Sequence, residues 1–266
     1  MSLQQTFDCA HPVALVTGSA APRVGRAIAL RLAARGCRLI IHARTSTDEA
    51  EAVAKQLRDQ GTDALAVQAA VEDSAAVESM IEAAMNRFGR LDILVNSAAT
   101  WEPTPLEDVT AEQLRRYFEV NAIGSFLTAK AAGLQMVTQT TGGAVINISD
   151  WATQRPYLDH AAYFPSKGAV EAMTRSLAVE LAHRNPHVRV NCIQPGPVLL
   201  SPETDLATRQ AIQDSVLVKR IGTADEVAHA VEFLSENRFV TGVILPVDGG
   251  KSIYANDGLQ IGRNTG

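Results

Sequence analysis

The chain has 266 residues, 46% of them hydrophobic, and a formal net charge of −5 at pH 7. That charge argues against a nucleic-acid surface, and no apolar run reaches the roughly 18 residues needed to span a bilayer. We therefore expect a soluble cytoplasmic protein that engages neither nucleic acid nor membrane, and the N-terminus has no signal-peptide pattern.

Cysteine and histidine usage predicts no metal centre. The cysteines, Cys9, Cys37 and Cys192, are scattered and odd in number, and the six histidines show no metal-ligand spacing. Such cysteines are typical of packing residues in a reducing compartment, where disulfide frameworks are rare.

Strand-like and helix-like segments alternate almost throughout the chain. Strands are predicted at Val13–Thr17, Arg38–His42, Ala64–Gln68, Asp92–Asn96, Ala144–Ser149, Val188–Ile193 and Gly242–Val247. Helices are predicted at Val24–Arg35, Thr47–Gln60, Ser74–Phe88, Ala111–Val137, Ala162–Arg184 and Ala224–Ser235. Short alternating units of this kind predict parallel strands with right-handed crossovers and helices on both faces of the sheet.

No linker or repeat interrupts this alternation, so we predict a single domain over residues 1–266 with a core at about 11–250. Residues 199–219 differ, because Pro202 and several charges break the pattern. This substrate-loop region is either a mobile lid or an irregular surface connection. The tail at 251–266 is expected to be loosely held unless a partner subunit docks it.

The first strand leads into a glycine-containing turn. Gly18 and Gly25 lie between this strand and the helix that begins at Val24. A strand, a glycine turn and a helix N-terminus form a pyrophosphate site, because unpaired N–H groups and the helix dipole face the anion. The pattern is not a strict G-x-G-x-x-G, and the alternative is a simple turn.

Tyr163 and Lys167 are four residues apart, so on a helix they share one face. A neighbouring ammonium favours the phenolate and is expected to bring the tyrosine pKa down from about 10 toward neutrality. Asp150 lies thirteen residues before the tyrosine, just past a predicted strand. A lone YxxxK is a weak signal, and its value here depends on the turn and strands that precede it.

Taken together, these motifs resemble the short-chain dehydrogenase/reductase family from about Val13 to Gly250. The matching pieces are Thr17-Gly18…Gly25, Asn96-Ser97-Ala98-Ala99, Asn121, Tyr163-x3-Lys167, Pro195-Gly196 and Val247-Asp248-Gly249-Gly250. The resemblance implies a Rossmann-type, doubly wound sheet of seven parallel strands in the order 3-2-1-4-5-6-7, with a nicotinamide cofactor at the carboxyl ends. It also implies that Asn121, Tyr163 and Lys167 are members of a catalytic tetrad.

The fourth member of the tetrad departs from the family pattern. Serine usually stands where this chain has Asp150, and Ser149 is one place earlier. Neighbouring strand residues point to opposite faces, so both side chains cannot easily reach the substrate. We favour Asp150 in the site, and the alternative is a register shift that makes Ser149 the usual hydroxyl. A buried carboxyl at this position is expected to have a raised pKa and to serve as an acid.

Aspartate at this position is shared with pteridine reductases, and other features are similar to theirs. The segments Asn96–Leu106, Asp150–Pro156 and Pro195–Leu200 resemble corresponding segments of those enzymes, and Arg23 matches an arginine of their glycine loop. Trp101 is expected to cover a flat heterocycle opposite the nicotinamide. The alternative for this tryptophan is a loop aromatic that covers a core edge.

Two positions do not match the pteridine reductases. Ala99 stands where they have a second serine, and Pro22 makes the glycine loop one residue longer.

The residues after the second predicted strand predict NADP(H). NAD-preferring proteins usually place an acid there for the ribose hydroxyls, whereas this chain has His42 and Arg44 and no acid until Asp48. Arginine binds phosphate with forked, charge-assisted hydrogen bonds. Arg44 is otherwise only a solvated loop charge. The residues expected to bind the cofactor are Gly18, Arg23, Gly25, His42, Arg44, Asn96, Lys167, Pro195 and Gly196.

We therefore expect an NADPH-dependent reductase of a C=N or C=O group, with a pteridine-like heterocycle held by Trp101, Asp150 and Tyr163. In this interpretation Tyr163 supplies the proton, Lys167 holds the nicotinamide ribose, and Asn121 keeps Lys167 linked to water. The alternatives are a carbonyl or 3-oxoacyl reductase, and a catalytically inert nucleotide-binding regulator. The family resemblance further implies a homo-oligomer, a dimer or tetramer.

Overall fold

The computed structural model describes residues 1–255, and its centre is a single parallel sheet. The sheet has seven strands in the order β3-β2-β1-β4-β5-β6-β7, which confirms the predicted fold class. The strands are β1 (Val13–Val16), β2 (Arg38–Ala43), β3 (Ala64–Gln68), β4 (Ile93–Asn96), β5 (Gly143–Ile148), β6 (Val188–Pro195) and β7 (Ile244–Val247).

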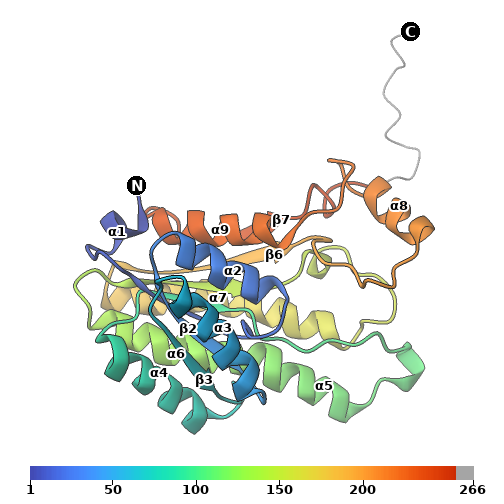
Figure 1. The fold of residues 1–266 in the computed structure, drawn as a ribbon. Helices are drawn as coiled ribbons and strands as arrows, with labels where there is room; N and C mark the ends of the chain where they lie inside the picture. Colours follow the sequence, from blue (N-terminus) through green and yellow to red (C-terminus); the bar gives the residue numbers. More distant parts are fainter. Residues whose placement is uncertain (256–266) are drawn as a thin grey trace.

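Helices cover both faces of this sheet (Figure 1). They are α1 (Leu3–Thr6), α2 (Val24–Ala34), α3 (Thr47–Asp59), α4 (Ser74–Phe88), α5 (Ala111–Tyr117), α6 (Gly124–Val137), α7 (Tyr163–Arg184), α8 (Leu206–Asp214) and α9 (Ala224–Glu236). One core cluster joins the sheet to α2, α3 and α9, and the other joins it to α4, α6 and α7. Strands β1, β4 and β5 are buried along their whole length, as expected for a sheet covered on both faces.

The predicted helix at Ala111–Val137 is not one regular helix, which corrects that expectation. Residues Phe118–Ile123 form a π-helical segment between α5 and α6. Single-turn π segments are rare and occur frequently at functional sites. Helical periodicity alone does not reveal this π-helical segment, because the apolar spacing of a helix continues on either side of it.

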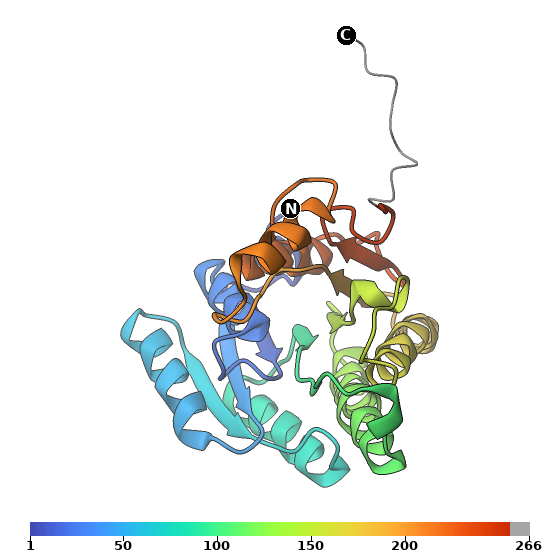
Figure 2. The same cartoon turned by 90° about the vertical axis from the view of Figure 1, so that its right-hand side faces the viewer.

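The carboxyl ends of β1, β4, β5 and β6 meet at one edge of the sheet. Figure 2 views the molecule from this side, with α8 in the upper part and α5 at the lower right. Helix α8 lies inside the 199–219 region, and residues 256–266 of the predicted tail lie outside the described part of the chain. No helix within residues 1–255 combines the length and apolar character needed to cross a membrane.

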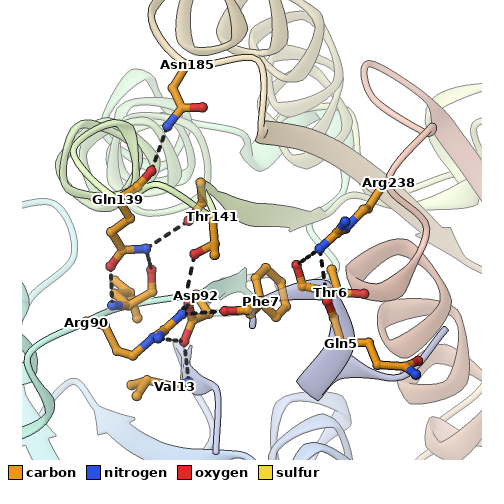
Figure 3. A network of polar contacts seen from close by, with 12 residues as sticks. Gln5, Thr6, Phe7, Val13, Arg90, Asp92, Gln139, Thr141, Asn185 and Arg238 are labelled. Atoms are coloured by element: carbon orange, nitrogen blue, oxygen red, sulfur yellow. Dashed lines mark hydrogen bonds and ion pairs between the residues drawn. The ribbon is translucent and has the colours of Figure 1, made fainter. Parts of the chain in front are cut away.

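A polar network closes the opposite end of the sheet (Figure 3). The Asp92 side chain is fully buried, accepts two-pronged hydrogen bonds from Arg90, and also accepts the Val13 N–H at 2.8 Å. Arg90 donates in addition to the Phe7 carbonyl oxygen at 2.9 Å. Burial raises the pKa of Asp92, and the bonds from Arg90 and Val13 oppose that rise. The N-terminal segment is thereby tied to the start of β1.

Asp92→Ala is expected to lower the free energy of unfolding by about 3 kcal/mol, because it leaves a partly buried guanidinium and a buried N–H without their acceptor. Urea unfolding measures this. The matched control is Asp63→Ala, which breaks the exposed Arg87–Asp63 pair and is expected to cost less than about 1 kcal/mol. Equal losses in the two variants would contradict the interpretation.

Candidate active site

A cleft of about 680 Å³ opens at the carboxyl edge of the sheet. Its walls come from the glycine turn after β1, the ends of β4 and β5, the start of α7, and the loop after β6. The sequence-predicted residues that line it are Gly18, Arg23, His42, Arg44, Trp101, Asp150, Tyr163, Lys167 and Gly196. The chain thus brings most of the predicted site residues to one surface.

Tyr163 and Lys167 occupy the first two turns of α7 and are buried, with exposed fractions of 6% and 4%. Pro165 is tolerated between them because first-turn N–H groups have no intrahelical partner. Lys167 Nζ donates to the Ile148 carbonyl oxygen at 2.9 Å and lies 5.9 Å from the centroid of the Tyr163 ring. The ammonium is therefore anchored to the end of β5 and lies beside the phenol ring.

Asp150, and not Ser149, contacts the phenol. The Tyr163 hydroxyl donates to Asp150 Oδ2 at 3.3 Å, while Asp150 Oδ1 accepts the Ala152 N–H at 2.9 Å. The Ser149 hydroxyl lies within hydrogen-bond distance of the Lys167 carbonyl oxygen and of Glu171 Oε1, at 3.1 and 2.7 Å. These two side chains are directed apart, as successive strand residues are.

The electrostatics of the tyrosine differ from the sequence-based expectation. Burial raises the pKa of Tyr163 well above its ordinary 10.0, and the negative charge of Asp150 raises that pKa further. The expected lowering by Lys167 is therefore not found in this structure. Burial lowers the pKa of Lys167 itself, and its ammonium donates to the Ile148 carbonyl oxygen. At neutral pH the phenol consequently keeps its proton.

The pKa of Asp150 is also raised, chiefly by burial. The Ala152 N–H and the charge of Lys167 act in the opposite direction. Asp150 and Tyr163 therefore form a coupled pair in which both groups hold protons more strongly than in water.

Asn121 is completely buried in the π-helical segment, and both ends of its amide are paired. Its Oδ1 accepts the Thr100 N–H at 2.9 Å, and its Nδ2 donates to the Thr100 carbonyl oxygen and to Ser166 Oγ, each at 3.0 Å. In the described residues no hydrogen bond joins Asn121 to Lys167. The amide instead ties the loop after β4 to α7, one residue before Lys167.

The glycine turn fits a dinucleotide. Gly18 has a φ of +67°, and a Cβ there would lie 3.0 Å from Ala98 Cα. A Cβ on Gly25 would lie 2.8 Å from the Gly18 carbonyl oxygen. Helix α2 begins at this turn, and no side chain caps its first N–H groups. Uncapped N–H groups at a helix N-terminus can bind an anion such as a pyrophosphate.

His42 supports this turn from behind. It is buried, its Nδ1 accepts the Gly18 N–H at 3.0 Å, and its Nε2 lies 2.9 Å from the Ala69 carbonyl oxygen. The two partners require a neutral ring with the proton on Nε2. Because both ring nitrogens are used, the imidazole positions Gly18 and has no free nitrogen for a phosphate.

The two arginines expected at the cofactor have different surroundings. Arg23 is the exposed N-cap residue of α2. Arg44 follows β2, is half-exposed, and forms an ion pair with Glu72. Both line the cleft, where Arg23 follows β1 and Arg44 follows β2.

Asn96, which was expected to bind the cofactor, is not among the residues that line the cleft. Its amide Nδ2 donates to the Ser125 carbonyl oxygen and to Asn147 Oδ1, and its Oδ1 accepts from Thr128. This side chain joins β4 to β5 and α6 inside the protein.

Gly196, by contrast, is at the cleft surface directly after Pro195, the last residue of β6. A Cβ on Gly196 would lie 2.5 Å from Asp248 Cα. Only glycine permits this close approach of the two loops.

Trp101 is half-exposed at 52% and stacks on His160, with ring centroids 5.6 Å apart. The sequence interpretation missed His160 and the neighbouring Tyr157, which pack on each other with centroids 4.9 Å apart. The sequence contains a pattern that could have indicated them, because Trp151, Tyr157 and His160 stand close together just after Asp150 and outside any predicted element. Nε2 of His160 is buried without a hydrogen-bond partner in the described residues.

A second cavity of about 610 Å³ shares Trp101, Asp150 and Tyr163 with the cleft. Leu199, Leu200 and the α8 residue Ile212 form part of its wall. The 199–219 region is therefore part of the candidate site.

The arrangement of a parallel sheet, a glycine turn and a buried tyrosine–lysine pair at its carboxyl edge is that of a dinucleotide-dependent oxidoreductase. Residues 19–252 match the family described as enoyl-(acyl carrier protein) reductase. The chain belongs to the short-chain dehydrogenase/reductase family.

Curated relatives agree with this assignment. An uncharacterized oxidoreductase of Methylorubrum extorquens is 36% identical over 90% of this chain and 96% of its own length. A short-chain dehydrogenase/reductase of Cladobotryum is 34% identical over 89% of this chain and 94% of its own length. The 3-oxoacyl-[acyl-carrier-protein] reductase of Synechocystis is 33% identical over 91% of this chain and 97% of its own length.

His42 is expected to resist protonation. Burial lowers its pKa from the ordinary 6.5, so the unfolded chain binds this proton more readily than the folded one. The contribution of His42 to stability is complete above pH 6.5 and is lost as the pH falls toward its folded-state pKa. Nitrogen-15 NMR of the imidazole is expected to show the Nε2–H form persisting below pH 6.5. An ordinary titration at 6.5, or the opposite tautomer, would contradict the arrangement.

Proposed function

We propose that this oxidoreductase is an NADPH-dependent reductase of a C=N or C=O group in a pteridine-like heterocycle. The observation that carries the proposal is the buried Tyr163 hydroxyl, which keeps its proton, donates to Asp150, and lies where the cleft meets the second cavity. A protonated phenol at that junction suits the reductive direction, in which the substrate must gain a proton.

When bound, NADPH supplies the hydride for the reducible carbon. Tyr163 then gives its proton to the nitrogen or oxygen that becomes negative, and the new N–H or O–H bond forms as the phenol O–H bond breaks. Asp150 is hydrogen-bonded to this phenol and has a raised pKa, so its carboxylate is placed to take up a proton from water and pass it to the Tyr163 phenolate. Lys167 stabilises the transient phenolate through its nearby positive charge.

Three features support NADP(H) over NAD(H). The first acid after β2 is Asp48, so no carboxylate directly follows the strand to accept the ribose hydroxyls. Arg44 and Arg23 line that end of the cleft, and both are accessible to a phosphate. The ion pair with Glu72 holds the Arg44 side chain at the cleft and engages only part of its guanidinium.

Support for a flat heterocycle comes from Trp101 and Asp150. Trp101 is exposed on the wall that the two cavities share, where a ring can stack on it. Asp150 has the donor and acceptor capacity that a ring nitrogen requires, whereas a serine offers a single hydroxyl. Both residues lie in segments that resemble those of pteridine reductases.

A 3-oxoacyl or simple carbonyl reductase is the second candidate, favoured by the similarity to the Synechocystis 3-oxoacyl-[acyl-carrier-protein] reductase. It uses the same tyrosine and lysine and differs in the substrate. An inert nucleotide-binding regulator has no need for the proton-transfer pair described above.

We further propose a homo-oligomer. The π-helical segment and α6 expose Ile123, Phe126 and Leu134 to between 42% and 47%, which supports association through these helices.

Tyr163→Phe is expected to reduce NADPH-dependent turnover by at least about 100-fold, because it removes the proton donor and preserves the ring. The assay compares a dihydropterin, a simple ketone and a 3-oxoacyl thioester, with NADPH and NADH in parallel. The proposal predicts the highest kcat/KM for the dihydropterin with NADPH.

The control is Ser149→Ala, which also removes one buried hydroxyl but leaves Tyr163 and Asp150 in contact; its turnover is expected to stay close to that of the unaltered protein. A fall in Ser149→Ala as large as in Tyr163→Phe would revive the register-shift interpretation. A preference for the thioester would favour the second candidate, and no turnover with any substrate would favour the regulator.

A further inference from the structure

The second cavity extends beyond the reacting groups. At one end are Asp150 and Tyr163, and Arg155 and Lys251 complete its wall. Arg155 lies in the segment Asp150–Pro156, but neither Arg155 nor Lys251 belongs to the motifs of the short-chain dehydrogenase/reductase family given above. The proposed reaction uses neither of them. Their presence on this wall therefore bears on what the cavity binds.

The body of the cavity suits a flat, apolar group. Trp151 stacks on Tyr157 with centroids 5.9 Å apart and planes inclined by 24°. Leu199, Leu200 and Ile212 provide aliphatic surface. Aromatic walls of this kind bind planar rings by stacking and by burial of apolar area.

Contacts with neighbouring residues hold both cations in place. The Lys251 ammonium lies 5.2 Å from the centroid of the Trp151 ring and donates to the Ser215 hydroxyl. Arg155 Nη1 donates to the carbonyl oxygens of Lys251 and Tyr254. The guanidinium is thereby fixed beside the backbone of the residue that carries the ammonium.

Nothing in the described residues neutralises this pair. Neither Arg155 nor Lys251 takes part in an ion pair within residues 1–255. Burial lowers the pKa of Lys251, and the positive charge of Arg155 lowers it further. Asp150 is the acid on the cavity wall, and its carboxyl is committed to Ala152 and Tyr163. Two cations on one cavity wall attract an anion.

We propose that this cavity binds a substrate with two parts: a flat ring presented to Asp150 and Tyr163, and a carboxylate or phosphate held by Lys251 and Arg155. The ring end of this inference rests on the proposed function. At the other end, the guanidinium provides a planar fork of donors and the ammonium a point charge, which together suit an oxyanion. The cation pair thus selects anionic substrates over neutral ones of the same shape.

The test measures binding to the full-length protein by titration calorimetry, without turnover. Three probes share one flat ring: naphthalene-2-carboxylate, 2-naphthyl phosphate and the neutral 2-naphthamide. At low salt the tighter of the two anions is expected to bind about tenfold more strongly than the amide, in line with charge-assisted hydrogen bonds. Whichever anion binds more tightly identifies the preferred acidic group.

Lys251→Met and Arg155→Met are each expected to remove most of that tenfold preference while leaving the affinity for the amide unchanged. Unchanged amide binding also shows that each variant is folded. Arg209→Met is the matched control, because Arg209 shares α8 with Ile212 but does not line the cavity. This control is expected to retain the full preference.

Equal affinity for the anions and the amide would overturn the proposal, as would failure of the amide to bind. An equal loss in Arg209→Met would overturn it too, because the preference would then come from the general field of the protein. Hydride transfer is not measured in this test. A failure of the proposed reductase activity therefore leaves the anion preference intact, and loss of the preference leaves the reductase proposal standing.

Discussion

The hydrogen bond from the Tyr163 hydroxyl to Asp150 is the interaction on which the candidate site depends. It joins the first residue of α7 to Asp150, two residues past the end of β5, and the parallel sheet brings these two elements to one edge. Burial raises the pKa of both groups, and the negative charge of Asp150 raises the pKa of Tyr163 further. Lys167 completes the arrangement from the same helix, with its ammonium fixed on Ile148. The sheet and helices thus place a protonated phenol, a carboxyl and an ammonium within one small volume.

The requirement that buried polar groups be paired explains how this geometry is held. Asn121 uses its whole amide to join Thr100 to Ser166, and Ser166 directly precedes Lys167 in α7. Ser149 is similarly committed to Glu171 of α7. His42 fixes the glycine turn through Gly18. Each of these contacts acts through a residue of the site and leaves the cleft surface free. The supporting side chains therefore limit movement of the reacting groups without blocking access to them.

Much of the fold was predictable because strand length, helical spacing and alternation are local properties of the sequence. The seven strands were predicted from these patterns, and their order was implied by the family resemblance. The Tyr163–Lys167 spacing placed both side chains on one helix face. What remained hidden depends on contacts between distant segments. The inward direction of Asn96, the use of both nitrogens of His42, and the interruption at Phe118–Ile123 each come from tertiary packing. The predicted direction of the Tyr163 pKa shift was wrong because it also depends on tertiary packing. Burial and the Asp150 charge raise that pKa.

The most direct test of the account is the pH dependence of kcat/KM for NADPH-dependent reduction by the unaltered protein and by Asp150→Asn. The alkaline loss of activity reports deprotonation of the essential acid in the free enzyme. Removing the carboxylate charge leaves burial unchanged and makes the phenolate easier to form, so the account predicts that the alkaline limb moves to lower pH in Asp150→Asn. If the alkaline fall in kcat/KM occurs at the same pH in both proteins, Tyr163 and Asp150 do not act as a coupled pair. That result would contradict the account.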